Sequence, residues 1–285
     1  MSTSREEVLG YFKEKADGYD LVDQQWYWVL SDSLLWDALV HHVFPKLPDD
    51  FVMLDAGGGT GRWTDRILSA FPKAQAVIFD ISPDMTKHAQ EKARRNHYEE
   101  RLTIAHGDLE QVQQHLKAST FDLIISFHNV MGFVNPEQVM PQLASLSKPG
   151  GLVVLFVPNR YHAAFFNIFQ ANIELAEDAI NHWLGKFVDD MPSLNLYSPS
   201  SLRNALQSCG LHCEWLSGFP SLVYPGYEET RIEGSSIHNQ ELLRDPVMFR
   251  RIFDLEKSVA AEPDAAARGN NLFVVAAKVV DGGRS

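Results

Sequence analysis

The sequence predicts a doubly wound α/β fold, on three observations. Five apolar runs rich in β-branched residues have the composition of buried parallel strands, at 51–55, 74–80, 101–108, 121–127 and 151–157. Segments of helix length lie between them, at 62–71, 83–97, 109–117 and 136–147. A turn with four glycines joins the first strand to the first helix. Strands that alternate with helices in this way predict a parallel sheet with right-handed crossovers.

The first 158 residues divide into an N-terminal lid (1–45) and an α/β core (46–158). The lid is expected to be helical and is rich in aromatic residues, such as Trp26, Trp28 and Trp36. In the core, Pro83 and Pro136 each follow a residue that caps helices well, so both are expected at the first helical position. The stretch Lys148–Gly151 is expected to end a helix and to turn into the fifth strand.

The chain after residue 158 is expected to add two insertions and two more strands to the core. Residues 159–197 form an aromatic, helix-like cap insertion, and 198–221 hold a capped helix followed by a strand near 211–217. Residues 222–267 form a second cap insertion, and 268–285 contain the last strand, at 270–279, and a tail. We expect the lid and both insertions to gather over the strand ends.

The composition narrows the class of partner. The chain carries 25 Lys and Arg against 37 Asp and Glu, a net charge of −12, whereas nucleic-acid binding depends on Lys and Arg. Cys209 and Cys213 make neither a disulfide framework nor a metal motif, so no metal is expected. The N-terminus lacks an apolar signal region, and no apolar run approaches 18 residues. A cytoplasmic protein without a membrane partner is expected, either a monomer or a homodimer.

The glycine turn decides between two kinds of cofactor. The dinucleotide pattern G-x-G-x-x-G, begun at Gly57, requires glycine at 62, but that residue is Arg62. The pattern present is Asp55-x-Gly57-x-Gly59-x-Gly61. It resembles the first motif of class I S-adenosylmethionine (SAM)-dependent methyltransferases. A dinucleotide brings a pyrophosphate to the helix N-terminus, whereas SAM brings an ammonium group, which needs oxygen acceptors.

Further positions along 51–157 match the same family. Asp80 ends the second strand, where a carboxylate accepts ribose hydroxyls. The resemblance implies seven strands with the last one antiparallel, and SAM as cofactor. It also assigns the other contacts: Asp108 and Leu109 to adenine, Ile81 and Met85 beside that ring, Phe127 to the methionine part, and Tyr11 and Tyr19 to the cover. The alternatives are strand-end capping for the two aspartates and ordinary packing for Ile81, Met85 and the tyrosines.

Methyl transfer from SAM is an in-line displacement, in which a general base helps an alcohol, phenol or ammonium nucleophile. A carboxylate nucleophile needs no base. His128, directly after the fourth strand, is the first candidate base, and His162, after the fifth, is the second. The insertions add His182, Glu228, Glu229 and His238. For any one histidine of the 11, a structural or surface role is the alternative.

The acceptor is expected to be an O or N nucleophile on a small, partly apolar molecule, enclosed by Phe165, Phe166, Phe169 and Trp183. The alternative is a tRNA wobble-uridine carboxyl methyltransferase, which the layout after the fifth strand and the Phe127-His128 and Leu255-Glu256 pairs resemble. Residues 185–199 and 227–236 depart from that group because they are acidic. A basic patch of Arg231, Arg244, Arg250, Arg251 and Arg268 would favour tRNA. Two other possibilities are a non-catalytic SAM-binding protein and an NAD-dependent dehydrogenase, the latter disfavoured by Arg62 and by Asp108-Leu109.

Overall fold

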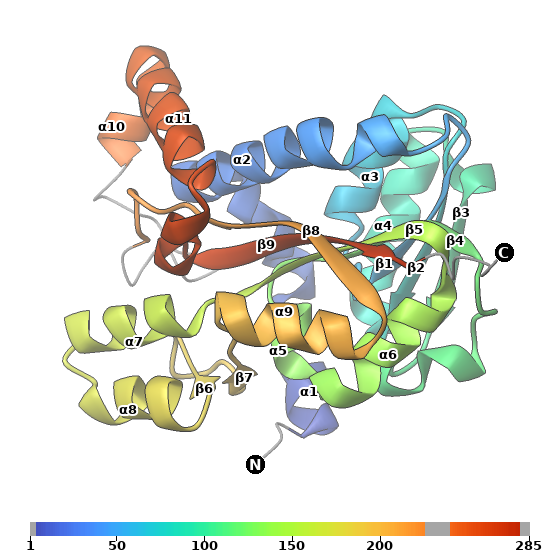
Figure 1. Ribbon diagram of the computed structural model, residues 1–285. Coiled ribbons are helices and arrows are strands. Elements are labelled where there is room, and N and C mark those ends of the chain that lie inside the picture. Colours follow the sequence, from blue (N-terminus) through green and yellow to red (C-terminus); the bar gives the residue numbers. More distant parts are fainter. Residues whose placement is uncertain (1–3, 226–239, 280–285) are drawn as a thin grey trace, which may run out of the picture.

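A computed structural model describes residues 4–225 and 240–279 and shows a seven-stranded sheet (Figure 1). The strand order is β3-β2-β1-β4-β5-β9-β8, and only β9 runs antiparallel to its neighbours β5 and β8. This confirms the predicted fold class, including the antiparallel last strand. The strands are β1 (Val52–Ala56), β2 (Gln75–Asp80), β3 (Leu102–His106), β4 (Phe121–Ser126), β5 (Ser147–Pro158), β8 (Leu211–Phe219) and β9 (Asn271–Lys278).

Helices cover both faces of the sheet (Figure 1). Successive strand residues enter opposite layers: Met53 packs on one side with Ile67, and Leu54 on the other with Leu143. The first layer contains α2 (Trp26–His42), α3 (Arg62–Ala70), α4 (Pro83–Arg95) and α11 (Pro246–Ala260). The second contains α5 (Val130–Phe133), α6 (Pro136–Leu146) and α9 (Pro199–Ser208). Strands buried on both faces explain why the apolar runs are almost continuous.

Two local predictions differ from the structure, and a third, the helix-like insertion, holds except for a short hairpin. The helix expected at 109–117 is a short 3₁₀ helix, η4 (Leu109–Gln114), in which Gln111 leaves helical geometry at φ −127°. The residues Lys148–Gly151 do not precede the fifth strand but lie inside β5, where the register with β4 shifts. Residues 160–197 form two helices, α7 (Arg160–Phe169) and α8 (Ile173–Asn181), followed by a small hairpin of β6 (Leu184–Gly185) and β7 (Leu194–Asn195).

The N-terminal segment is helical, as predicted. It consists of α1 (Arg5–Lys15), the 3₁₀ helix η1 (Ala16–Gln24), α2 and the short 3₁₀ helix η2 (Phe44–Lys46). The helices α7 and α8 lie side by side and project from the sheet at the lower left of Figure 1. None of the helices within 4–225 and 240–279 is long and apolar enough to cross a bilayer.

The second insertion is joined to the core through Glu256. It contains α10 (Gln240–Arg244), α11 and the 3₁₀ helix η6 (Pro263–Arg268), which leads into β9. The carboxylate of Glu256 on α11 is fully buried. It accepts hydrogen bonds from the backbone N–H groups of Ser221, Leu222 and Val223, at 2.7, 2.8 and 2.8 Å. The turn after β8 therefore depends on one side chain from α11.

Candidate active site

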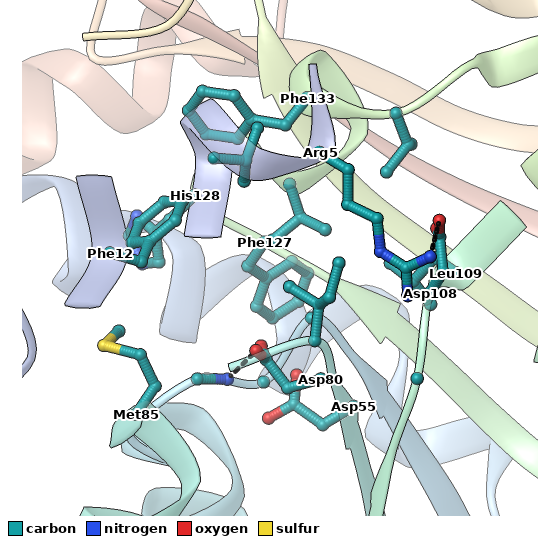
Figure 2. Close-up of a pocket in the computed structure, with 18 of the residues that line it drawn as sticks. Arg5, Phe12, Asp55, Asp80, Met85, Asp108, Leu109, Phe127, His128 and Phe133 are labelled. Carbon is teal, nitrogen blue, oxygen red and sulfur yellow. Dashed lines mark hydrogen bonds and ion pairs between the residues drawn. The ribbon is translucent and has the colours of Figure 1, made fainter. Parts of the chain in front are cut away.

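A cavity of about 360 Å³ opens at the carboxyl ends of β1, β2 and β4 and is covered by α1 (Figure 2). Ligands of open α/β sheets bind at this edge. Most residues expected from the sequence to contact the cofactor or substrate line this cavity: Tyr19, Asp55, Gly57, Gly59, Asp80, Ile81, Met85, Asp108, Leu109, Phe127 and His128. Tyr11, Gly61 and His162 are not among its lining residues.

The three alternate glycines of the turn have positive φ, but they leave room for different neighbours. A Cβ on Gly57 would lie 2.4 Å from Val130 Cγ1, and one on Gly61 would lie 2.9 Å from Ala89 Cβ. A Cβ on Gly59 would meet only the end of Met85, at 3.2 Å. Gly61 therefore allows α3 to approach α4, whereas Gly59 keeps the loop open at the cavity.

Two buried carboxyl groups lie beneath the glycine loop. Burial raises the pKa of Asp55 to about 7, although the Thr64 hydroxyl, 2.7 Å away, donates to its Oδ2 and opposes that shift. Burial also raises the pKa of Asp80, which accepts the N–H groups of Gly59 and Ser82 at 2.9 and 2.8 Å. Buried acceptors next to an open cavity favour a ligand with hydroxyl and ammonium donors.

Asp108 lies on another wall of the cavity and meets α1 there. Its Oδ1 accepts the Glu110 N–H at 2.9 Å, and its Oδ2 lies 3.4 Å from Nη1 of Arg5, as Figure 2 shows. Arg5, Val8 and Phe12 all line the cavity and follow the i, i+3, i+7 spacing of one helix face. This spacing was visible in the sequence. Tyr11 lies next to that face and packs against a separate apolar cluster.

Arg62 explains why the dinucleotide pattern is broken at that position. Its guanidinium donates to Asp23 in η1 and to Asp32 in α2, so the first residue of α3 holds the N-terminal segment. Burial opposes the charged form of Arg62, but these carboxylates together outweigh it and raise the pKa of Arg62. Burial opposes ionisation of Asp32, but His128 and Arg62 together lower its pKa. Neither acid was singled out from the sequence, because nothing local marks an ion pair between distant helices.

His128 follows β4 in a left-handed conformation, with φ 54°. Its Nε2 lies 2.7 Å from Nε1 of Trp63 and 3.4 Å from Oδ1 of Asp32. An indole N–H can only donate, so Nε2 accepts the shorter hydrogen bond. That nitrogen is therefore occupied within the protein, which argues against the expected role of neutral His128 as a base.

His162 is separated from the cavity, and the structure does not support it as a second base. It lies on α7 among Phe166, Phe187 and Tyr224, with ring centroids 6.4, 6.0 and 5.0 Å away. Both ring nitrogens are buried without a hydrogen-bond partner among the described residues, and burial lowers the pKa of His162 to about 3. It is thus a neutral packing residue.

The cap residues expected around the substrate also lie away from the cavity. On α7, Phe166 is buried and Phe165 and Phe169 are exposed, and the ring centroid of Trp183 lies 3.6 Å from the Arg160 guanidinium. His182 is exposed at the end of α8. Glu228, Glu229, Arg231 and His238 lie outside the described residues. In the ranges 4–225 and 240–279, no group of three His, Cys, Asp or Glu side chains is placed to hold a metal ion.

The sequence matches the model of a family described as "Methyltransferase domain" over residues 31–214. The chain belongs to the class I SAM-dependent methyltransferases. It is 28% identical over 149 residues to the tRNA 5-carboxymethoxyuridine methyltransferase of Escherichia coli K12, covering 52% of this chain and 56% of that protein. It is 34% identical over 104 residues to malonyl-[acyl-carrier protein] O-methyltransferase 2 of Ilyobacter polytropus, covering 36% and 38%. The methyltransferase thus spans about half or less of the length of these relatives.

Solved structures show the same fold. Geranyl diphosphate C-methyltransferase from Streptomyces coelicolor, solved with S-adenosyl-L-homocysteine, superposes with a TM-score of 0.55 at 14% identity, covering 87% of this chain and 79% of that one. The methyltransferase in a complex with the Haloferax volcanii Trm112 methyltransferase activator superposes with a TM-score of 0.58 at 15% identity. The superposition covers 95% of this chain and 98% of that one. The cofactor of this methyltransferase is S-adenosylmethionine, as the glycine motif predicted.

The charge of the cavity suits this cofactor. Asp55, Asp80, Asp108 and Glu110 line it. Its two arginines are already paired, Arg5 with Asp108 and Arg62 with Asp23 and Asp32. An ammonium group and a ribose find hydrogen-bond acceptors in such a site. A pyrophosphate would instead lie next to carboxylates, and the two arginines that could bind it are already paired.

Proposed function

We propose that this methyltransferase transfers the methyl group of SAM to an O or N nucleophile on a small, partly apolar molecule bound in the same cavity. The observation that carries the proposal is the cavity beneath α1. The same cavity contains carboxylate oxygens that can accept hydrogen bonds from the cofactor and an apolar wall that suits a substrate. When bound, the cofactor supplies an activated methyl group, and the protein supplies alignment and exclusion of water.

The buried carboxylates are assigned to the cofactor. Asp80 would accept the ribose hydroxyls, and Asp108 with Leu109 would hold the adenine, for which Ile81 and Met85 would form the adjoining wall. Asp55 lies at the ammonium end, where ionised oxygen is the useful acceptor. Phe127 packs edge-on against Trp63, with ring centroids 5.3 Å apart, and would support the methionine part of the cofactor.

The acceptor site is assigned to the part of the cavity around His128. Phe12, Val130 and Phe133 line it together with His128, and Phe12 packs edge-on against Phe133 at 5.4 Å. A mostly apolar wall with one imidazole suits a molecule whose body is apolar and whose reacting group is polar. Residues of α1 cover this wall, and the aromatic residues expected there from the first insertion (Phe165, Phe166, Phe169 and Trp183) do not.

A tRNA carboxyl group is the second candidate acceptor. The E. coli relative is named for carboxymethoxyuridine in tRNA, and the sequence match to it extends over 149 residues. Arg244, Arg250 and Arg251 lie on α10 and α11 and are exposed, although Arg250 pairs with Asp254. The net charge of −12 weighs against tRNA, because phosphate contacts supply most of the affinity for nucleic acid. A cytoplasmic location stays a prediction.

The test is a calorimetric titration with S-adenosylhomocysteine, with NAD as the control, followed by a transfer assay with methyl-labelled SAM. The assay compares a small-metabolite extract with bulk tRNA. Binding of S-adenosylhomocysteine alone, with label entering the metabolites, supports the proposal. Label in tRNA would favour the second candidate, and binding without any transfer would indicate a non-catalytic SAM-binding protein.

A further inference from the structure

The arrangement of groups around His128 determines which ring nitrogen carries a proton. In a neutral imidazole one nitrogen donates and the other accepts. The Trp63 N–H points to Nε2 at 2.7 Å, so a proton on Nε2 would bring two N–H groups against each other. The neutral ring therefore carries its proton on Nδ1. Since the indole N–H is a donor without an acceptor function, it cannot adapt to the other tautomer.

Asp32 competes with Trp63 for the same nitrogen. Its Oδ1 lies 3.4 Å from Nε2 and is buried without a hydrogen-bond partner among the described residues, while its other oxygen accepts a hydrogen bond from Arg62. Within the described residues, the charged groups at this ring are Asp32 on α2 and, behind it, Arg62 on α3. If the ring gains a second proton, Nε2–H can turn to Asp32. Nδ1 keeps its proton in that state too, so it is a donor whether the ring is neutral or charged.

The other side of the ring faces the cavity. Nδ1 makes no hydrogen bond to any residue in the described part of the chain, and it is not among the buried polar atoms that lack a partner. The side chain retains 14% of its surface and lines the cavity. Figure 2 shows His128 apart from the Asp108 wall of the cavity. A substrate group in the cavity therefore meets the N–H of Nδ1. The lone pair that a general base needs is on Nε2 and points to Trp63.

We propose, resting on the proposed function above, that Trp63 holds His128 as a hydrogen-bond donor and so restricts the methyl acceptor to a group with an anionic oxygen, a carboxylate. One carboxylate oxygen accepts the Nδ1–H of His128. The other oxygen forms the bond to the methyl carbon while the methyl–sulfur bond breaks and its electron pair stays on sulfur. The negative charge of the carboxylate and the positive charge of the sulfonium both disappear, and no proton is released. Trp63 and Asp32 are positioning residues in this scheme.

The direct test is ¹⁵N NMR of histidine-labelled protein with S-adenosylhomocysteine, with the His128 signals assigned from their loss in His128→Gln. We expect a protonated Nδ1 and an unprotonated Nε2. In Trp63→Phe, Asp32 is left as the partner of Nε2, and we expect the tautomer to reverse. Trp36→Phe removes an indole that lies outside the cavity lining and should leave the signals unchanged. A neutral His128 with its proton on Nε2 in the unaltered protein would overturn the proposal.

The second test compares acceptors that share one apolar body and differ in a carboxylate, an alcohol or an amine. We expect label to enter the carboxylates, and kcat/KM for them to fall about tenfold in Trp63→Phe, the cost of about one hydrogen bond. Label confined to alcohols or amines would overturn the donor role and leave the proposed function intact. Failure to bind S-adenosylhomocysteine would instead overturn the proposed function, while the tautomer of the ligand-free protein still decides the role of Trp63.

Discussion

At the scale of single residues, the protonation of Asp55 makes both stability and cofactor binding depend on pH. Its pKa is raised to about 7 mainly by burial, above the ordinary value of about 3.9 for aspartate. Between these two values the folded protein retains a proton that the unfolded chain has lost. The contribution of Asp55 to the free energy of unfolding therefore falls as the pH rises through this window and is constant above it.

We expect the melting temperature of the ligand-free protein to fall between pH 5 and pH 7, and the fall to be smaller in Asp55→Asn. We also expect the affinity for S-adenosylhomocysteine to rise over the same range, by up to about tenfold per pH unit, because the ligand's ammonium needs the ionised acid. Calorimetry at several pH values measures this. The pKa of Asp80 is also raised by burial, so Asp80 contributes a change with pH in the same direction. The effect of Asp55 is therefore measured as the difference between Asp55→Asn and the unaltered protein. Equal pH slopes for both proteins would remove Asp55 from the cofactor site.

The glycines allow a second test at this scale. We expect Gly59→Ala to lower the free energy of unfolding by only about 1 to 2 kcal/mol, the cost of placing alanine in a left-handed backbone conformation. Its Cβ would contact only the flexible end of Met85. The affinity for S-adenosylhomocysteine should fall at least tenfold. Gly61→Ala carries the same backbone cost and adds a 2.9 Å contact with Ala89, so it should lose more stability than affinity. Denaturant unfolding and calorimetry measure the two effects, and the reverse ranking would contradict this account.

The cavity residues that follow a strand could be found from the sequence, since strand ends are recognisable. Asp55 and Asp80 lie in the last residues of their strands, and Asp108 and His128 follow theirs by two residues. Phe12 was missed in favour of Tyr11, although the spacing from Arg5 and Val8 marks the correct helix face. Trp63 and Asp32 could not be assigned, because their role depends on where α2 lies against the end of β4.

At the scale of elements, ion pairs hold the N-terminal segment to the core. Arg62 is mostly buried between Asp23 and Asp32. Thr60 and Lys92 bind a third acid of the same segment, Asp20, at 2.6 Å each. The lid is thus joined to the glycine loop and to α4 by charged groups, in addition to its apolar packing.

Arg62→Met should lower the free energy of unfolding by about 3 kcal/mol, because it leaves the buried Asp32 without its cation. Adding Asp32→Asn should recover much of the loss. Lys73→Met removes an exposed ion pair with Asp49 and should change stability by less than about 0.5 kcal/mol. Denaturant unfolding of the single and double variants measures the coupling, and additive effects would show that the pair does not act as a unit.

Element boundaries were predictable where the backbone follows one repeating pattern. The helix starts at Pro83 and Pro136 are confirmed, because each proline follows a capping residue. The stretch Lys148–Gly151 has turn composition, yet pairing with β4 draws it into β5. Phe165, Phe166 and Phe169 on α7 were expected around the substrate. A helical sequence pattern predicts that α7 and α8 form, but it does not predict where this pair of helices packs on the core.

At the scale of the whole molecule, the excess of 12 negative charges governs encounters with other macromolecules. We expect affinity for bulk tRNA to be weaker than about 100 µM at physiological salt, the weak end of non-specific binding. Fluorescence anisotropy of labelled tRNA measures this, with a basic protein of similar size as the positive control. Micromolar binding that weakens steeply with salt would show that a local basic surface outweighs the net charge.

The position of β9 in the sheet has a consequence for protein synthesis. This strand begins at residue 271, yet it lies between β5 and β8, which the ribosome has made long before. Until residues 271–278 emerge, β5 and β8 cannot join one sheet and each keeps an unpaired edge. Such edges are sites of aggregation in incomplete chains. The nascent protein therefore completes its sheet only after residues 271–278 have been made, and a chain that stalls before them keeps both edges open.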